Sequence, residues 1–226
     1  MDSVNLIKGV SMKKFKPIIE IIFYVVLPIV IWKYGREPLG DYYAMLLSTA
    51  PAFVYTVWNF FNERQFNVSG LYIMSSLLVN TILDLLSDSA EWMLWNGIYF
   101  NFGMIAFLLL TIAIKKPIVM YFLIDAAYVQ GTPREESRKK YKSKELFKYF
   151  QWLTAFLILR DVLESGVKIW LIYKYGVEGY DKILIAMRTF GWIMSVVFVG
   201  AVMFVFNKIT QQDEKEKSEE EEEKVI

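Results

Sequence analysis

Apolar residues recur along the chain in long runs that are separated by shorter polar segments. Runs of roughly 20 residues are long enough to cross the hydrocarbon core of a bilayer. They lie at about residues 17–34, 41–61, 69–87, 96–114, 147–173 and 183–207. Backbone polar groups must be paired within lipid, so we expect each run to be a helix. The pattern predicts an all-α fold, a polytopic membrane helix bundle of about six transmembrane helices over residues 17–207.

Polar segments flank this bundle at both ends. Residues 1–16 are expected to form a cytoplasmic arm, and Met12 is a second candidate for the native start of the chain. Residues 208–226 include the stretch DEKEKSEEEEEK and lack apolar periodicity. A segment of this composition buries too little apolar surface to fold, so we expect a disordered acidic tail in the cytoplasm.

A longer polar segment at 115–146 separates the fourth and fifth runs. Within it, residues 118–129 (IVMYFLIDAAYV) are apolar but too few to span, which predicts an interfacial helix. The sequence Thr132-Pro133-Arg134-Glu135 then has the residues of a helix start, with Thr132 as the N-cap. The basic helix after it is expected to run directly into the fifth span, with residues 134–148 against anionic lipid head groups.

Lysine and arginine are concentrated in alternate polar segments, beginning with the N-terminal one. This asymmetry predicts that both termini are cytoplasmic. The composition, 55% hydrophobic and 17% aromatic, agrees with a membrane protein. The sequence has no cysteine and no histidine, which excludes disulfide bonds, thiol chemistry, the usual general base and a common zinc ligand. We therefore expect no metal, no cofactor and no catalytic residue.

One run carries charges where a span is expected to be apolar. In RDVLESGVK (160–168), the charged residues share one helix face at about 100° per residue. They are Arg160, Asp161, Glu164 and Lys168. Arg160–Glu164 and Glu164–Lys168 have the i,i+4 spacing of helix ion pairs. At 1.5 Å per residue Arg160 lies about 16 Å from the inner interface, near the middle of the membrane, so this face is expected to point into the bundle.

Asp84 and Arg188, in neighbouring spans, are candidate partners of this face. The set is close to neutral, which suits a buried network that locks the bundle and equally suits a path for a solute or an ion. Pro28 and Pro51 are expected to break the first and second spans. Interrupted spans can mark a transporter site, and small residues around such a break also allow close packing.

A second polar pattern extends the third run. Asn80, Asp84, Asp88 and Glu91 follow one another at spacings of four, four and three residues. On a continuous helix they would line one face. The pattern predicts an acidic outer mouth that attracts cations.

Four stretches of the chain together resemble a known family. They are FYVVLPIVIWKYG (23–35), DYYAMLLSTAPAFVYTVWNFF (41–61), KKPI (115–118) and MRTFGWIMSVVFVGAVMFVF (187–206). They resemble uncharacterised bacterial multi-pass membrane proteins related to intracellular septation protein A. The resemblance implies a place in the bacterial cytoplasmic membrane and a role in envelope synthesis or division, and it supplies no site residues.

Three classes of function stay open. A small transporter or permeation pathway would use Arg160, Glu164 and Lys168 as a central site, with Asp84 and Arg188 as outer gate or partner. A non-catalytic scaffold of the envelope or septum would use the same charges only to hold the bundle. An intramembrane enzyme is the third class, and no intramembrane protease motif supports it. Expected partners are the lipid bilayer, envelope proteins and a second copy of the chain, and no nucleic acid.

Overall fold

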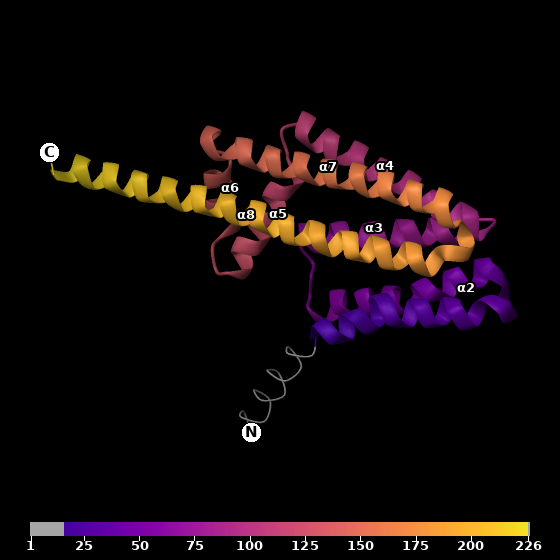
Figure 1. Cartoon of the computed structure of the whole chain (residues 1–226). Coiled ribbons are helices and arrows are strands. Elements are labelled where there is room, and N and C mark those ends of the chain that lie inside the picture. Colours follow the sequence, from indigo (N-terminus) through magenta and orange to yellow (C-terminus); the bar gives the residue numbers. More distant parts are fainter. Residues whose placement is uncertain (1–15, 226) are drawn as a thin grey trace, which may run out of the picture. The chain divides into compact units, whose positions relative to one another are not determined.

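The computed structural model describes residues 16–225, and all secondary structure in this part of the chain is helical (Figure 1). The elements are the π-helix η1 (Ile22–Val26), α2 (Leu27–Asn62), α3 (Val68–Leu85), α4 (Ala90–Ala113), α5 (Ile118–Val129), α6 (Arg134–Tyr141), α7 (Lys144–Tyr175), the 3₁₀-helix η2 (Val177–Gly179) and α8 (Tyr180–Val225). Stretches long and apolar enough to cross a membrane are Lys16–Asn62, Val68–Leu85, Ala90–Ala113 and Val177–Gln211. The predicted all-α class is confirmed, and these helices indicate a membrane-embedded protein.

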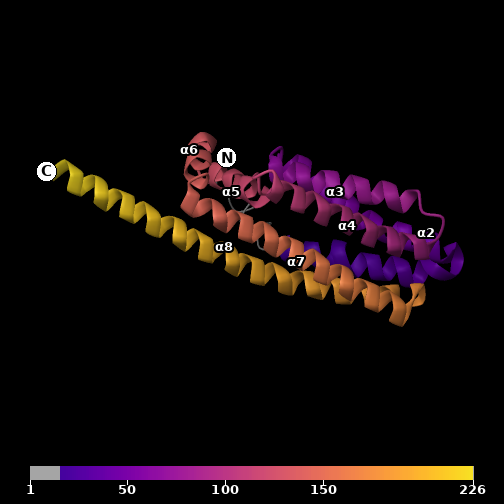
Figure 2. The same ribbon diagram turned by 90° about the horizontal axis from the view of Figure 1, so that it is seen from above.

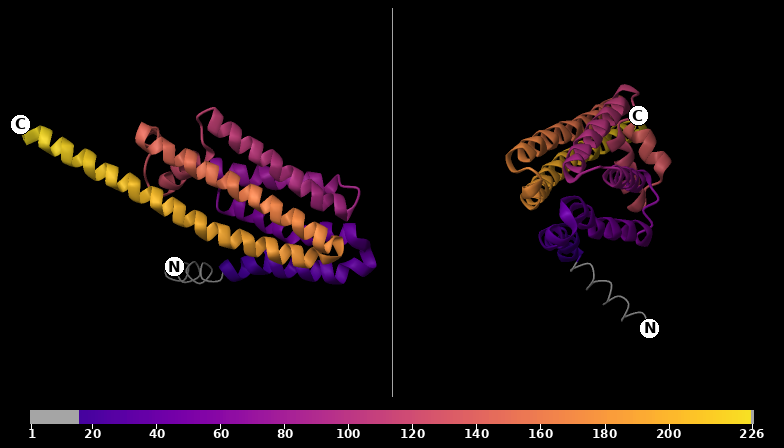
Figure 3. Two further views of the ribbon diagram at one scale, coloured as in Figure 1. Left: turned by 45° about the horizontal axis from the view of Figure 1, so that its top comes forward. Right: turned by 90° about the vertical axis from the view of Figure 1, so that its right-hand side faces the viewer.

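Helix α2 and the residues before it form a hairpin of two antiparallel arms joined at Gly40. Gly40 has φ 77° and ψ 166°, a conformation essentially restricted to glycine. Between the arms, the rings of Phe23 and Tyr55 stack at 5.0 Å, and the Tyr24 hydroxyl lies 2.7 Å from Thr56 Oγ1. The predicted first and second spans correspond to these two arms (Figure 3).

The two prolines that were predicted to break the first and second spans, Pro28 and Pro51, do not both interrupt the hairpin. Pro28 follows the π-helix Ile22–Val26, whose wider turn accommodates the missing N–H and the ring of the proline. Helix α2 continues through Pro51, because the non-helical residue inside it is Gly40. The predicted break at Pro51 is therefore wrong. Membrane helices tolerate proline where their neighbours compensate for the lost backbone bond.

The chain divides into two compact units, where the sequence suggested one bundle domain. The first unit comprises the chain up to Phe66, Gly70–Phe100 and Val167–Arg188. It therefore contains the α2 hairpin and parts of α3, α4, α7 and α8. Its apolar core is formed by Trp32, Ala44, Met45, Ala90, Met93, Leu94, Ile98, Leu171, Ile172 and Ile183.

The second unit comprises Asn67–Ser69, Asn101–Gly166 and the chain from Thr189 onward. Its core is formed by Leu108, Ile118, Val119, Met120, Leu123, Ile124, Tyr141, Leu146, Phe150, Leu153, Leu157, Val205 and Ile209. The short apolar helix predicted at 118–129 is present as α5 with the same bounds. Half of its residues are buried, so α5 is part of a protein core as well as a candidate for the membrane interface.

The basic segment after α5 differs from its prediction in two ways. Helix α6 begins at Arg134, and its N-cap position is Pro133 rather than Thr132, with no side-chain cap. It also ends at Tyr141, so the basic helix does not run into the fifth span. Helix α7 starts anew at Lys144, where the backbone N–H of Leu146 lies 3.4 Å from Ser143 Oγ. A serine in this position stabilises a new helix start, which explains the break.

The acidic tail is also different from its prediction. Helix α8 has 46 residues and continues without interruption to Val225 (Figure 2). Lys, Glu and Gln are strong helix formers, and a helix that is already nucleated extends at little cost. The predicted disorder of 208–226 is therefore wrong for the residues up to 225. The N-terminal arm and Met12 lie outside the described residues, apart from Lys16.

Candidate functional site

The four charged residues between positions 160 and 168 of α7 lie on the more buried face of this helix. Asp161 and Ser165 are buried, and Arg160, Glu164 and Lys168 are half-buried. The opposite face is apolar and exposed, and it is formed by Leu159, Val162, Leu163 and Trp170. This distribution is the one expected of a span whose charges avoid lipid.

In the second unit, Arg160 pairs with its neighbour Asp161. The Nε and Nη2 atoms of Arg160 donate to Asp161 Oδ1 at 2.8 and 2.6 Å. Asn101 of α4 holds this turn of α7 by two hydrogen bonds. Its Nδ2 donates to the Asp161 carbonyl oxygen at 2.9 Å and to Ser165 Oγ at 2.8 Å. The sequence predicted an ion pair of Arg160 with Glu164, four residues on. In the structure, Arg160 pairs with the adjacent residue, Asp161.

The two residues differ sharply in exposure. The Asp161 side chain is 3% exposed, whereas 37% of the Arg160 side chain is uncovered. A partly exposed arginine side chain therefore lies next to an aspartate side chain that is almost fully enclosed.

In the first unit, Lys168 lies next to Gly97 of α4. A Cβ atom added to Gly97 would lie closer to Lys168 Nζ than a carbon and a nitrogen can approach. The glycine therefore makes room for the ammonium. The charge of Lys168 also acts on the Asp84 carboxylate of α3, which is 7% exposed and accepts a hydrogen bond from Asn80 Nδ2 at 3.2 Å.

Tyr180 is a further polar residue of the first unit, in contact with Ser48 and Trp32. Its hydroxyl lies 3.2 Å from Ser48 Oγ, and the charges of Asp84 and Arg188 both act on it. Its ring contacts Trp32 edge-on, with the centroids 5.1 Å apart. The structure thus brings the charges of Asp84 and Arg188 to bear on Tyr180, a half-buried tyrosine that the sequence did not single out.

Arg188 contacts an aromatic ring that the sequence analysis did not consider. Its guanidinium lies over the ring of Tyr24, 5.2 Å from the centroid. Tyr24 belongs to the π-helix that precedes Pro28. The helix irregularity therefore places an aromatic face against a cation, a favourable contact.

The predicted acidic mouth does not form as a single helix face. Helix α3 ends at Leu85, so only Asn80 and Asp84 belong to it. Asp88 lies in the following turn and Glu91 in the first turn of α4, and both are exposed. The prediction of one continuous face is wrong because Ser89 starts a new helix, with its Oγ 3.2 Å from the backbone N–H of Trp92.

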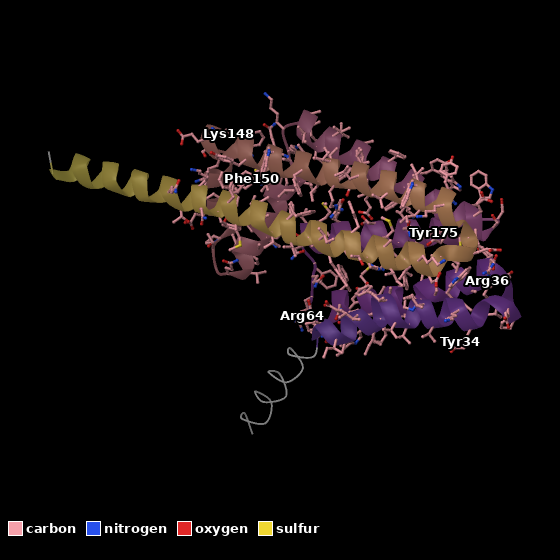
Figure 4. The ribbon with its side chains drawn as sticks, in the orientation of Figure 1. Tyr34, Arg36, Arg64, Lys148, Phe150 and Tyr175 are labelled. Carbon is pink, nitrogen blue, oxygen red and sulfur yellow. The ribbon has the colours of Figure 1, made fainter. Side chains whose placement is uncertain are left out.

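The first unit does have a charged pocket at the end of the α2 hairpin (Figure 4). It measures about 480 Å³ and is lined by Trp32, Lys33, Arg36, Glu37, Asp41, Glu178 and Asp181. Arg36 lies within it and donates from Nε to Asp41 Oδ1 at 2.6 Å, and its Nη2 lies 3.7 Å from Glu178 Oε1. Sequence reasoning missed this pocket, although the charges that flank Gly40 and Gly176 were the available signal.

Asp125 is a second residue that the sequence analysis missed. It is buried in the second unit, and its Oδ2 accepts the backbone N–H groups of Val68 and Ser69 at 2.7 and 3.3 Å. Its Oδ1 lies 3.3 Å from Arg134 Nη2, and that guanidinium lies over the Tyr128 ring at 4.2 Å. One carboxylate therefore caps the start of α3 and holds the start of α6.

The pair of Lys16 and Glu63 makes stability depend weakly on pH. Lys16 Nζ donates to Glu63 Oε1 at 2.5 Å, and Gln65 Nε2 donates to Oε2 at 2.7 Å. The bond from Lys16, followed by the one from Gln65, holds the pKa of Glu63 below its ordinary value of 4.5. A lowered carboxyl pKa stabilises the folded state above that ordinary value. The contribution is lost as the pH falls through the lower, folded-state pKa.

Glu63→Gln is therefore expected to cost a few tenths of a kcal/mol at neutral pH and nothing at a pH well below the lowered, folded-state pKa of Glu63. The effect is small because both side chains are more than one-third exposed. Thermal unfolding of the wild type and the variant across this pH range measures it. In a Lys16→Gln background the same substitution should change little. A stability difference that persists unchanged to low pH would contradict this assignment.

Comparison with known proteins leaves this site without a family assignment. No protein-family model, curated protein or solved structure matches the chain. The relation to the septation protein family therefore stays a prediction.

Proposed function

We propose that the chain is a small transporter or permeation pathway whose charged solute moves along the polar face of α7. The apolar helices fit an integral membrane protein, and the resemblance favours the bacterial cytoplasmic membrane. In this proposal α7 is itself a span. Its 32 residues extend over about 48 Å at 1.5 Å per residue, more than the thickness of a bilayer core. The predicted six spans and the cytoplasmic termini belong to the same proposal.

The observation that carries the proposal is the exposure of Arg160. A charge at the centre of a span costs about 2.5–3.5 kcal/mol on insertion scales, even with some relief from water. Asp161 compensates part of the charge, yet 37% of the Arg160 side chain remains uncovered. An arginine side chain that is uncovered to this extent at this depth requires water or a polar partner beside it. An aqueous path along the α7 face meets that requirement.

The other polar residues support a path for solute on the outer side. The charged pocket at the α2 hairpin carries four acidic and two basic side chains, so its net charge attracts cations. Its Trp32 contacts Tyr180, whose hydroxyl in turn is acted on by Asp84. Within the first unit, polar and aromatic groups thus connect the pocket to the buried carboxylate.

Cysteine labelling tests the proposal directly, because the chain has no native cysteine. Single cysteines at 160, 164 and 168 would be treated in intact cells with a membrane-impermeant thiol reagent. We expect labelling of at least one of them, and protection when a transported solute is added.

Leu159→Cys and Val162→Cys provide the matched controls on the same helix. Both positions are on the exposed apolar face of α7, so hydrocarbon should shield their thiols from a charged reagent. Denaturation of each variant in detergent establishes that its thiol is present and reactive. Absence of labelling at positions 160, 164 and 168 in the folded protein would overturn the transport proposal.

A scaffold is the alternative, and the unbroken α8 favours it. A helix that continues through the acidic segment to Val225 presents that segment as a rigid extension. Helix α6 carries exposed basic residues that would contact anionic lipid heads, a further way of organising a membrane region. Under this alternative a partner protein or second copy covers Arg160, and the cysteines on the inward face stay unlabelled.

A further inference from the structure

Two arginines of α6 lie over two tyrosines of α5, and the two helices pack against each other. The Cζ atom of Arg134 is 4.2 Å from the centre of the Tyr128 ring. The Cζ atom of Arg138 is 5.9 Å from the centre of the Tyr121 ring. The arginines are four residues apart on α6 and the tyrosines seven apart on α5, so each pair shares one helix face. The contact therefore presents two guanidinium groups on one face of α6.

Asp125 holds the first of these arginines in place without covering it. The Asp125 side chain is 5% exposed, and its Oδ1 lies 3.3 Å from Arg134 Nη2. About half of the Arg134 side chain, 49%, remains exposed. A guanidinium has five N–H donors, and this ion pair engages it at Nη2. Arg134 can therefore bind a second anion while it holds Asp125.

The net charge of α6 is modest, so a diffuse attraction alone does not give tight binding of an anion. The helix has four basic and two acidic residues. The acidic ones, Glu135 and Glu136, are exposed and lie in the first turn, between the two arginines in the sequence. A tightly bound anion must therefore receive directed hydrogen bonds. Arginine is suited to this role, because its planar fork donates two parallel bonds to a phosphate.

We propose that this face of α6 binds an anionic phospholipid with two phosphates, of the diphosphatidylglycerol type, through Arg134 and Arg138. Each guanidinium donates to one phosphate and stays over its tyrosine ring. Basic surfaces beside membrane helices take head groups of this class. The inference goes beyond the proposed transport and does not depend on it. It also goes beyond a general attraction of residues 134–148 to anionic lipid, because it names two donors and one head group.

The geometry favours two phosphates over one, and a lipid over a soluble anion. Seven residues at 1.5 Å each separate the two tyrosines by about 10 Å along α5. A single phosphate between the arginines would draw at least one of them off its ring, whereas two phosphates joined by a glycerol reach both. The end of α5 also exposes apolar surface, with 52% of Tyr128 and 78% of Val129 uncovered. Acyl chains can cover this surface, which a soluble diphosphate leaves in water.

Lipid binding to the wild-type protein tests the site in its native form. The purified protein in detergent would be titrated with diphosphatidylglycerol or with phosphatidylglycerol, compared at equal total negative charge. Native mass spectrometry measures the fraction of protein that carries each lipid. We expect diphosphatidylglycerol to bind about ten-fold more tightly, because its second phosphate engages a second guanidinium. Equal occupancy at equal charge would overturn the proposal.

Three variants of α6 separate the two-arginine site from a diffuse basic surface. Arg138→Gln should weaken the binding of diphosphatidylglycerol by about ten-fold, because it removes charge-assisted hydrogen bonds to a phosphate. Arg138→Lys keeps the charge but loses the fork, and should weaken binding nearly as much. Lys139→Gln is the matched control. It removes the same charge from the neighbouring exposed residue, and should weaken binding by no more than roughly five-fold.

The outcomes of these titrations differ clearly. Equal losses in Arg138→Gln and Lys139→Gln, or full binding by Arg138→Lys, would overturn the site in favour of a diffuse basic surface. Displacement of the bound lipid by inorganic diphosphate would overturn the assignment to a lipid. All three variants should keep the wild-type Tm in lipid-free detergent, because positions 138 and 139 are exposed. The comparison of the two lipids on the wild type needs no variant, so it decides the proposal even where a variant fails to fold.

Discussion

Asp161→Ala is expected to lower the free energy of unfolding by about 1–3 kcal/mol, because it removes two charge-assisted hydrogen bonds from Arg160, whose side chain is partly exposed. The aspartate is buried and receives two hydrogen bonds from the arginine. Alanine removes both bonds and leaves a cavity beside Asn101. Unfolding of the purified protein in detergent, followed by tryptophan fluorescence, measures the loss.

The double replacement Arg160→Met with Asp161→Leu separates structure from function. A buried pair exchanged for apolar residues of similar volume often leaves stability unchanged. We therefore expect the double variant to recover most of the loss of Asp161→Ala. If the α7 face is a path, the same variant should lose transport and the labelling of a cysteine at 164. Full transport activity in the double variant would show that the Arg160–Asp161 pair has only a structural role.

Phe150→Ala is expected to cost about 3–5 kcal/mol, the usual effect of removing a large core side chain. Phe150 of α7 is completely buried in the second unit, and its ring lies 4.9 Å from that of Tyr141 in α6 (Figure 4). The substitution removes the anchor between the basic helix and α7. Unfolding of the variant in detergent measures the cost, and protease sensitivity of the 130–144 segment should rise with it.

Phe102→Ala is the matched control for this substitution. Phe102 belongs to α4 in the same unit, and 47% of it is exposed. Its loss should change stability by a small fraction of the Phe150 effect. Equal costs for the two substitutions would show that the core assigned to the second unit does not control its stability.

Helix positions followed from the sequence because the bilayer leaves the chain few alternatives. Apolar runs must be helical in lipid, so the run at 69–87 predicted α3 and the run at 147–173 predicted α7, to within a few residues. Helix geometry alone predicted that the charged residues at positions 160–168 share one face of α7. The helix face predicted from residue spacing was extended too far, to Asp88 and Glu91. Spacing alone does not reveal that Ser89 caps the start of a new helix, α4.

The closest contacts could not be predicted, because they depend on how separate helices approach one another. Gly97 and Lys168 are far apart in sequence, and neither residue type marks a site by itself. The same holds for Asp125, which reads as one polar residue in an apolar helix until the start of α3 is placed beside it. The role of Tyr180 likewise could not be predicted from the sequence, because it depends on the contacts of Tyr180 with Ser48 and Trp32.

The turn at Gly40 has a consequence for the biogenesis of the protein. The two arms of the hairpin meet tightly there, so they can enter the bilayer together as one unit rather than in two separate events. With the cytoplasmic termini that we propose, the translocated segment is short, and the charges of Lys33 and Arg36 are offset by those of Glu37 and Asp41. A nearly neutral, compact turn crosses the hydrocarbon at far lower cost than a long charged loop. The tight turn that Gly40 makes possible thus keeps the segment between the first two proposed spans short.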